Sequence, residues 1–366
     1  MGDSDELQRI IDEVVVPNAA DVDVSGRFPG EAVAALRPTG LLGLAGSEAG
    51  LGPAADVLRR IAAHCGSTAM VVLMHYAASV VIEHHGPDDV RRSIAAGEHL
   101  ATLAFSEQGS RSHFWAPQGT ATATGDDAVR LDAAKSWVTS AADADSYVWS
   151  SQPLEGEGPM TLWLVPSGTE GLTVGGRFDG LGLRGNGSVP VVASAVLVDR
   201  RSMLGDDGAG LDVALAEVLP WFLVLSAAFS VGLMEAVTAE TGQHLRSTRL
   251  EHLDERLADQ PLVRVDHARM RLATDQAAAL LSDTLAALET GRDDAMLRVL
   301  EVKAAAGEAA IAVTDLAMKV CGGAAFRKEL GIERRFRDAR AARVMAPTTD
   351  ALLDFVGRAI NGLPLL

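Results

Sequence analysis

Residues 5 to 95 carry apolar side chains at helical spacing, interrupted by turn signals. Three stretches show the pattern: LQRIIDEVV, GRFPGEAVAALRPTGLLGL and ADVLRRIAAHCGSTAMVVLMHYAASVVIEHHG. Apolar positions three and four residues apart are typical of helices that pack one face on a core. The third stretch is apolar enough to predict a buried helix. We therefore expect a helical domain over residues 1–100.

At about residue 100 the pattern changes to short runs in which polar and apolar residues alternate. The stretch TATATGDDAVRLDAAKSWVTSA alternates on both sides of a Gly-Asp-Asp turn, which predicts a β-hairpin. SYVWSSQ, MTLWLVP, GLTV and VPVVASAVLV follow at short intervals, with Gly or Pro between them. Residues 101–205 are therefore predicted to form an all-β domain.

Helical spacing returns after GDDGAGLD and predicts a second helical domain over residues 206–366. Its three long segments cover about 213–247, 262–290 and 294–320. The third segment has a narrow face of small residues, which lets a neighbouring helix approach closely. That face is Leu300, Ala304, Gly307 and Ile311. The order α, then β, then α predicts an α+β chain that is mainly α.

The stretch RFRDARAARVMAPTTDALLDF, residues 335–355, has the pattern of a helix that stops and begins again. Residues 335–344 are basic and rich in Ala, and Pro347 interrupts them because proline cannot continue a helix. The side chains of residues 348–350, Thr-Thr-Asp, are typical helix N-caps. A second helix is therefore predicted to begin directly after the break.

Composition limits the possible partners. The chain has 366 residues, 48 % of them apolar, a formal net charge of −17 and a pI near 4.9. This acidic balance argues against a nucleic-acid or anionic-membrane surface, since both need clustered Lys and Arg. The acidic first residues do not look like a secretory signal, and we expect no stretch with the ~20 apolar residues of a membrane span. A soluble cytoplasmic protein is therefore expected. Two isolated cysteines and scattered histidines also predict no metal site.

A series of short motifs lies in a fixed order along this pattern. They are FPGEAVAALRPTGLLGL, LAFSEQGSRS (103–112), KSWVTSA, LGLRGNGS (181–188), MLGDDGAGL (203–211), KVCGGAAF and ERRFRDARA. Over nearly the full length the chain thereby resembles the acyl-CoA dehydrogenase family of flavoproteins. The resemblance implies an N-terminal helical domain, a middle β-barrel or sandwich and a C-terminal four-helix bundle. It also implies FAD as the cofactor and a homodimer or homotetramer.

The resemblance assigns flavin contacts to the two motifs that open the β domain. Phe105 and Ser106 would meet the flavin ring through main chain and hydroxyl. Ser112, or Gly109 if the gap falls differently, would lie near the pyrophosphate. Trp137 would stack near the isoalloxazine, with Thr139 hydrogen-bonding toward the N5 side of the ring. From the residues alone, Trp137 and Thr139 alternate on a predicted strand, a pattern more typical of ordinary sheet residues than of cofactor contacts.

Further cofactor contacts are implied in the second helical domain. Gly322 and Gly323 would allow close approach to the dinucleotide of a neighbouring subunit, although both also suit a simple helix end. Arg249, with Arg246 as the second choice, would reach an adjacent subunit's pyrophosphate. Thr348 is also implied as a cofactor contact, because it matches the Thr that follows the family's catalytic Glu in the sequence Glu-Gly-Thr.

The chain departs from the family at that base. In the family's dehydrogenases, the Arg-Asp-Ala-Lys run leads to a Glu that removes the α-proton of an acyl thioester. Aligned on residues 337–340, this chain has Ala346 there, followed by Pro347. The second position that the family uses, ten residues before Gly232-Leu233, is Phe222. Neither residue accepts a proton, and general-base catalysis typically contributes about 10²- to 10⁴-fold.

Replacement bases are few. Asp350, one turn beyond Ala346, and His113, near the flavin motif, are weak candidates; Glu107 and His75 are weaker still. Asp350 is also suited to a plain role at a helix N-terminus, where an acid meets the helix dipole.

Three functions follow. The first is an FAD-dependent oxidoreductase that acts on an acyl thioester of coenzyme A or a carrier protein, with an electron-transfer partner. The second is a monooxygenase of the same fold that receives reduced flavin from a flavin reductase and hydroxylates a small, for example aromatic, molecule. The third is a partner subunit in a mixed oligomer. The first is favoured.

Overall fold

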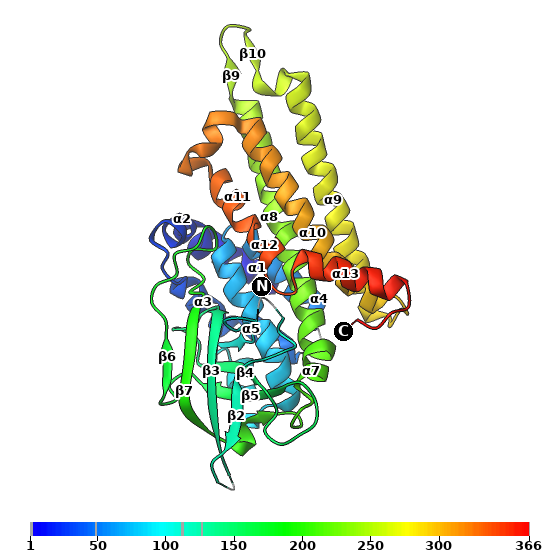
Figure 1. The fold of residues 1–366 in the computed structure, drawn as a ribbon. Helices are drawn as coiled ribbons and strands as arrows, with labels where there is room; N and C mark the ends of the chain where they lie inside the picture. The colour runs from blue at the N-terminus through cyan, green and yellow to red at the C-terminus, as the bar shows by residue number, and fades with distance from the viewer. Residues whose placement is uncertain (1–2, 48–49, 111–112, 126, 366) are drawn as a thin grey trace. The chain divides into compact units, whose positions relative to one another are not determined.

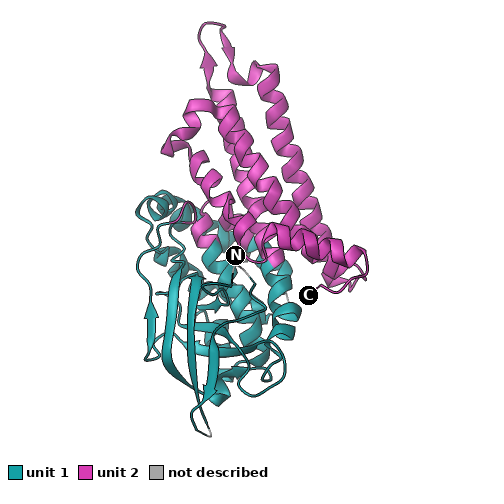
Figure 2. Cartoon of the chain, viewed as in Figure 1, with its two compact units in different colours: residues 1–57, 70–179, 184–222 teal, residues 58–69, 180–183, 223–366 magenta. Residues whose placement is uncertain are grey.

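The computed structural model describes residues 3–47, 50–110, 113–125 and 127–365. The chain divides into two compact units, which we call unit 1 and unit 2 (Figure 2). Unit 1 consists of residues 1–57, 70–179 and 184–222, and unit 2 of residues 58–69, 180–183 and 223–366. Helices, then strands, then helices follow one another along the chain, as predicted (Figure 1). The boundaries at residues 100 and 205 stay a prediction.

The first hundred residues are helical, as their spacing predicts. The helices are α1 (Asp3–Ile10), α2 (Val16–Ser25), α3 (Gly30–Leu36), α4 (Leu51–Ala62), α5 (Gly66–His85) and α6 (Asp88–Ala95), with a π-turn at Ile11–Val15 and 3₁₀ turns at Arg37–Thr39 and Leu41–Gly46. Helix α5 is buried along most of its length. The Tyr76 hydroxyl donates to the Leu41 carbonyl at 2.6 Å, which attaches α5 to the Leu41–Gly46 turn.

The predicted strands form two four-stranded sheets in unit 1. One has the order β1-β4-β5-β8 and the other β2-β3-β7-β6. The strands are β1 (Ala101–Ala104), β2 (Thr120–Ala123), β3 (Ala128–Val138), β4 (Ser146–Ser151), β5 (Thr161–Pro166), β6 (Leu172–Val174), β7 (Val189–Asp199) and β8 (Met203–Leu204). The hairpin predicted from the alternating stretch is β2–β3, in which Thr120 pairs with Asp132.

The two sheets face each other across one core, so the β domain is a sandwich. Trp149 and Trp163 of the first sheet belong to the same buried cluster as Leu131 and Val191 of the second. β7 alternates buried and exposed residues along most of its length, because one face packs on this core and the other meets solvent. β4 is buried throughout.

The second helical region follows the predicted segments to within a few residues. Its long helices are α8 (Leu219–Ser247), α9 (Pro261–Glu289) and α10 (Ala295–Cys321), preceded by α7 (Gly210–Val213) and a π-turn at Ala214–Val218. α10 packs on α9, and the Thr238 carbonyl of α8 bonds to His267 Nε2 of α9 at 3.0 Å. A short hairpin of β9 (Arg249–Leu250) and β10 (Glu255–Arg256), which the sequence pattern did not predict, joins α8 to α9.

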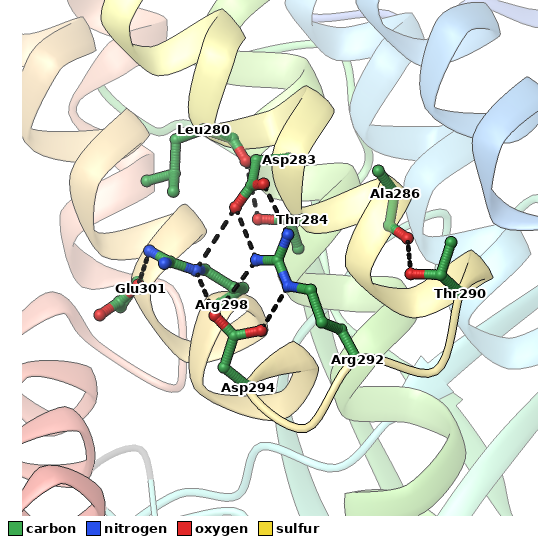
Figure 3. Close-up of polar contacts among 9 residues, drawn as sticks. All are labelled: Leu280, Asp283, Thr284, Ala286, Thr290, Arg292, Asp294, Arg298 and Glu301. Atoms are coloured by element: carbon green, nitrogen blue, oxygen red, sulfur yellow. Dashed lines mark hydrogen bonds and ion pairs between the residues drawn. The ribbon is translucent and has the colours of Figure 1, made fainter.

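Arginine side chains hold the corner between α9 and α10 (Figure 3). Arg292 donates to both carboxylate oxygens of Asp283, at 2.8 and 2.9 Å, and also to Asp294. Arg298 on the first turn of α10 bonds to Asp294 at 3.0 Å and to Glu301 at 3.1 Å. These guanidinium groups pair with carboxylates at the surface. Each such pair adds little stability, but together the pairs connect the two helices at the turn between α9 and α10.

The predicted break in residues 335–355 is present. The chain runs from α11 (Ile332–Ala339) into α12 (Ala341–Val344), and α13 (Thr349–Ile360) begins after Pro347. The Thr348 hydroxyl caps α13 by accepting from the Ala351 N–H at 3.3 Å. Short 3₁₀ turns at Gly322–Phe326 and Lys328–Leu330 connect α10 to α11. The pattern of proline followed by Thr-Thr-Asp therefore predicted the local structure correctly.

One expectation is wrong. Among the residues that the structure describes, three helical stretches are long and apolar enough to span a membrane: Gly66–His85, Gly210–Ser247 and Ala295–Phe326. In the structure 89 %, 67 % and 44 % of their most apolar windows are buried within the protein. The first two stretches are thus mostly buried against protein, as apolar core helices are, whereas less than half of the third is buried.

Candidate functional site

The structure joins the two motifs that open the β domain. The segment that follows β1 lies against the end of β3, because the Ser136 N–H donates to the Ser106 carbonyl at 2.8 Å. The Gln108 N–H donates to the Ala134 carbonyl at 3.0 Å, and Glu107 and Lys135 form a bridge between the two stretches. Residues about thirty apart in sequence thus form one continuous surface in unit 1.

A buried ion pair holds these two stretches together. Lys135 Nζ lies 2.6 Å from Glu107 Oε1, and both side chains are almost fully buried. Lys135 also donates to the carbonyl and hydroxyl oxygens of Ser150, at 2.6 and 2.8 Å. Burial lowers the pKa of Lys135 to about 8, although the Glu107 carboxylate acts in the opposite direction.

Glu107 is engaged on both of its carboxylate oxygens. Oε2 accepts the Gly119 N–H at 3.0 Å and also the Gln118 N–H. Together with the Lys135 ammonium, these donors satisfy the buried carboxylate. Glu107 therefore serves as a structural anion, and its geometry does not present it as a free base.

Trp137 departs from ordinary strand geometry. The pairing of β3 with β7 shifts register between Lys135 and Val138, and Trp137 has φ 57°. Such a bulge re-aims the side chain at the bulged position. The indole of Trp137 is 67 % exposed, and its ring contact is edge-on with Phe178 at 6.3 Å between centroids. Trp137 therefore lies on the predicted strand, β3, but at a bulge and not at a regular position.

The neighbouring candidates occupy different environments. Thr139 lies just past the end of β3 and is buried, with its hydroxyl 2.9 Å from the Ser188 hydroxyl. Phe105 is buried, whereas Ser106 is half-buried and its hydroxyl bonds to no other described residue. Gly109 has φ 88° and open space around it, so the chain has room there for a ligand. Ser112 lies outside the described residues.

Neither histidine candidate is placed as a base. His113 is exposed, and its Nδ1 bonds to the Ser110 carbonyl at 3.0 Å. His75 is fully buried between two main-chain groups: the Ala101 N–H donates to its Nδ1, so Nε2 carries the proton that the Leu42 carbonyl accepts at 3.0 Å. Burial lowers the pKa of His75 to about 4, and its role is to join α5 to its neighbours.

In unit 2 the structure joins two further motifs, LGLR and RFRDA. Asp338 Oδ1 accepts the Leu183 N–H at 2.6 Å, and Arg337 donates to the Leu181 carbonyl at 3.1 Å. Leu183 has φ 52°, a left-handed conformation that this hydrogen bond helps to hold. A Cβ on Gly182 would come within 2.5 Å of the Arg337 main chain, so only glycine allows this approach.

Arg335, from the same motif, is a buried cation that sequence reasoning did not assign. It pairs with Glu240 of α8 at 2.8 Å and donates to the Ala63 carbonyl at 2.7 Å. Burial lowers the pKa of Arg335 and raises the pKa of Glu240. The run of arginines in RFRDARA marks this position, but its partner, more than ninety residues away, has no local signal.

The turn that carries Ala346 is attached to α10 by Lys303. The Lys303 ammonium donates to the carbonyl oxygens of Pro347 at 2.7 Å, Met345 at 2.9 Å and Ala342 at 3.3 Å. Burial lowers the pKa of Lys303 to about 7. Sequence reasoning missed Lys303, although it lies one turn before Gly307 on the predicted face of small residues.

That face does bring another helix close, as predicted. A Cβ on Gly307 would lie 3.3 Å from the Cβ of Ala342 in α12. Ala346 itself is half-buried and Pro347 is buried. Asp350 is exposed on the first turn of α13 and near the charge of Arg343, a position typical of an acid at a helix N-terminus.

The remaining cofactor candidates lie elsewhere in unit 2. Gly322 ends α10 with φ 56° and ψ −137°, a conformation open to glycine, and neither Gly322 nor Gly323 has an atom within 4 Å of a built Cβ. Arg249, on β9, is exposed and pairs with Asp254 across the hairpin. Arg246 lies on the last turn of α8 beside Gly242.

Three family models match the chain in succession. Residues 4–97 match the acyl-CoA dehydrogenase N-terminal domain, residues 102–196 the middle domain and residues 208–361 the C-terminal domain. The chain belongs to the acyl-CoA dehydrogenase family. A curated relative in this family, the mitochondrial short-chain specific acyl-CoA dehydrogenase of Bos taurus, is 29 % identical over 356 residues, covering 91 % of this chain and 83 % of its own length.

Solved structures confirm the acyl-CoA dehydrogenase fold. Butyryl-CoA dehydrogenase from Megasphaera elsdenii superposes with a TM-score of 0.90 at 20 % identity, covering 98 % of both chains. The FAD complex of PigA superposes with a TM-score of 0.88 at 19 % identity, covering 98 % of this chain and 97 % of that one. The family comprises flavin-dependent oxidoreductases that bind FAD.

The residues in unit 1 fit such a cofactor. An exposed, left-handed Trp137, the hydroxyl of Ser106 and the open surround of Gly109 lie along one joined pair of motifs. A large aromatic held outward in a strained conformation is typical of a ligand contact rather than of a core. That Trp137, Ser106 and Gly109 contact FAD stays a prediction.

Proposed function

We propose that the chain is an FAD-dependent oxidoreductase that acts on an acyl thioester of coenzyme A or a carrier protein, without a carboxylate base at residue 346. The observation that carries the proposal is the joined pair of motifs in unit 1, with the Trp137 indole 67 % exposed beside the Phe105–Ser106 segment. The thioester is inferred from the family and from the short-chain acyl-CoA dehydrogenase relative.

The proposed roles follow from the chemistry of each group. FAD, when bound, supplies the two-electron redox chemistry. Trp137 offers an apolar face for a flat ring, and the Ser106 hydroxyl offers a donor and an acceptor at the same surface. The buried Lys135–Glu107 pair keeps the two motifs in register. Residues 341–349 contain no Asp or Glu, so in this proposal the turn positions substrate and does not remove a proton.

The test begins with the purified full chain. We expect FAD to co-purify and its absorbance to bleach when acyl thioesters are added without oxygen. Trp137→Ala should weaken FAD binding by about tenfold or more, because base-like stacking on an indole contributes ~1–3 kcal/mol. Leu197→Ala is the matched control, since Leu197 is a 58 % exposed apolar residue on β7 of the same unit. Wild-type protein that binds no flavin would sink the proposal.

The absent acid favours one second candidate, a monooxygenase that uses reduced flavin supplied by a reductase. Oxygen transfer to a small, for example aromatic, molecule needs no α-proton acceptor, and Ala346 supplies none. Chemically reduced enzyme mixed with oxygen distinguishes the two: a long-lived flavin–oxygen adduct together with no bleaching by thioesters supports the monooxygenase. Neither signal, with FAD bound, would point to a partner subunit in a mixed oligomer.

A further inference from the structure

The backbone of residues 345–347 lies between two helices and has few helical hydrogen bonds of its own. The Met345 N–H still donates to the Ala341 carbonyl at 3.0 Å, and α13 begins only at Thr349. Pro347 has no N–H, so this turn depends on its carbonyl groups for attachment. Two of these, Met345 and Pro347, accept from the same ammonium group, that of Lys303.

We propose that Lys303 is a positioning residue: its ammonium group sets the place of the Met345–Pro347 turn, and with it the side chain of residue 346 and the N-cap Thr348. This inference rests on the proposed function only for the turn's role beside substrate and cofactor. Lys303 touches main-chain oxygens and does not itself meet the reacting atoms.

Three main-chain carbonyl groups converge on the Lys303 ammonium. An ammonium group has three N–H donors and no acceptor, and Lys303 Nζ is within hydrogen-bond distance of three carbonyl oxygens, those of Ala342, Met345 and Pro347. A neutral amine has two donors and a lone pair, so one carbonyl must lose its donor when Lys303 loses its proton. Protonated Lys303 therefore holds the turn at both ends, and neutral Lys303 holds it less completely.

The Lys303 side chain lies in a closely packed part of unit 2. It is 2 % exposed, and one turn further along α10 a Cβ on Gly307 would lie 3.3 Å from the Cβ of Ala342. The chain has 28 arginines and only four lysines, at residues 135, 303, 319 and 328. A compact ammonium group on a flexible stem suits three convergent carbonyl oxygens, whereas the planar fork of arginine suits carboxylates.

Charged groups on the elements packed on α10 have partners of their own. On α11, Arg335 pairs with Glu240, Arg337 pairs with Glu333, and Asp338 accepts the Leu183 N–H. On α12, Arg343 pairs with Glu308 of α10, and Arg340 just before it pairs with Asp315. On α9, Asp266 pairs with Lys319, Asp275 pairs with Arg271, and His267 bonds to Thr238 of α8. On α13, Asp350 is exposed. Carboxylates and guanidinium groups ordinarily keep their charge near neutral pH, so among the described residues that bond to the turn it is Lys303 whose charge changes there.

The first test observes the turn directly and needs no cofactor. The four lysines, labelled with ¹⁵N at Nζ, give four signals, and Lys303→Met identifies that of Lys303. Labelled methionine methyl groups report on Met345, whose signal is identified with Met345→Leu. We expect the Met345 signal to move with the same midpoint as the Lys303 titration. In Lys303→Met it should stay near the high-pH position of the wild type at every pH.

A Met345 signal that does not move while Lys303 titrates would overturn the inference. That result can be obtained from the wild-type protein alone, so it stands even if Lys303→Met does not fold. It is also independent of flavin, so a chain that binds no FAD contradicts the proposed function and leaves this measurement decisive for Lys303.

The second test connects the turn to the site. At pH 6, Lys303→Met should bind FAD or a thioester about tenfold more weakly than wild type, because hydrogen bonds from a charged donor are lost. Lys328→Met is the matched control, since Lys328 is exposed on the 3₁₀ turn after α10. As pH rises through the Lys303 titration, the wild type should approach the variant. Equal affinities for wild type and Lys303→Met at pH 6 would reject the positioning role.

Discussion

Two buried lysines, Lys135 in unit 1 and Lys303 in unit 2, are compensated in different ways. Lys135 meets a carboxylate, Glu107, at 2.6 Å and the two oxygens of Ser150. Lys303 meets three main-chain carbonyl groups. Burial lowers both pKa values, that of Lys135 to about 8 and that of Lys303 to about 7. A nearby opposite charge thus leaves the first lysine the stronger base.

The difference indicates what each lysine is for. An ion pair inside a protein fixes two side chains against each other, and its disruption leaves an uncompensated charge. A cation that donates to carbonyl groups fixes main chain, as Lys303 fixes the carbonyl groups of Ala342, Met345 and Pro347. The ion pair of Lys135 therefore holds two motifs together over a wide pH range. The hydrogen bonds of Lys303, in contrast, change when Lys303 loses its proton near neutral pH. At the surface, by contrast, Arg292 pairs with Asp283 at the corner between α9 and α10 (Figure 3).

The largest expected effect is on Lys135. Lys135→Met leaves the Glu107 carboxylate buried without its cation, and loss of one partner of a buried pair costs about 3–5 kcal/mol. Urea unfolding followed by circular dichroism measures this loss. Lys328→Met, an exposed lysine, should change the free energy of unfolding by less than about 0.5 kcal/mol. A loss equal to that of the control would show that Glu107 is satisfied by main-chain donors alone.

A carboxylate added at residue 346 would give Lys303 a nearby anion, as Glu107 does for Lys135. Ala346→Glu places an anion on the turn that Lys303 holds, so the pKa of Lys303 should rise. If the turn faces an acyl thioester, flavin bleaching by thioesters should increase by about 10²-fold or more, as general-base catalysis provides. Ala346→Gln has the same size without the charge, and equal bleaching rates in the two variants would contradict the prediction.

The pH dependence of stability is the next effect in size. A lysine in the unfolded chain keeps its proton up to about 10.5, whereas folded Lys303 loses it near 7. Between these values the unfolded state binds more protons, so the free energy of unfolding rises with pH. The slope approaches about 1.4 kcal/mol per pH unit. Lys135 adds a similar rise that begins only near pH 8.

Lys303→Met isolates the first part of that rise. In the variant the free energy of unfolding should not rise between about pH 7 and 8. It should still rise above about pH 8, where Lys135 loses its proton in the folded state. Urea titrations at half-unit intervals from pH 6.5 to 9.5 resolve the two steps. Parallel curves for wild type and variant between pH 7 and 8 would assign the rise to another group.

The sequence predicted those features that depend on neighbours along the chain. Alternation predicted the β2–β3 hairpin, and Pro347 followed by Thr348 predicted where α13 begins. The left-handed bulge at Trp137 was not predictable from alternation, because it arises where β3 shifts its register on β7, more than fifty residues away. The same limit applies to Lys303, whose acceptors lie 39 to 44 residues further along.

Membership in the family was predictable because motif order survives where single residues change. What each motif residue touches was not. Glu107 was considered as a replacement base, yet Lys135 and two main-chain N–H groups occupy it. Asp338 and Leu183 belong to different motifs, and only the fold reveals that one accepts the hydrogen bond of the other. A pattern can thus predict that residues matter before it can predict which of them meet.

The smallest expected effect is on Asp350, the remaining acid near the turn. It is exposed on the first turn of α13, beyond the part of the backbone that Lys303 holds. Asp350→Asn keeps the size of the side chain and should change stability by no more than about 0.5 kcal/mol, the range of a helix-dipole contact. The pH profile of thioester-dependent bleaching should also be unchanged. A loss of bleaching in Asp350→Asn, with FAD still bound, would instead identify Asp350 as the replacement base. The turn that Lys303 holds would then have a functional carboxylate beside it.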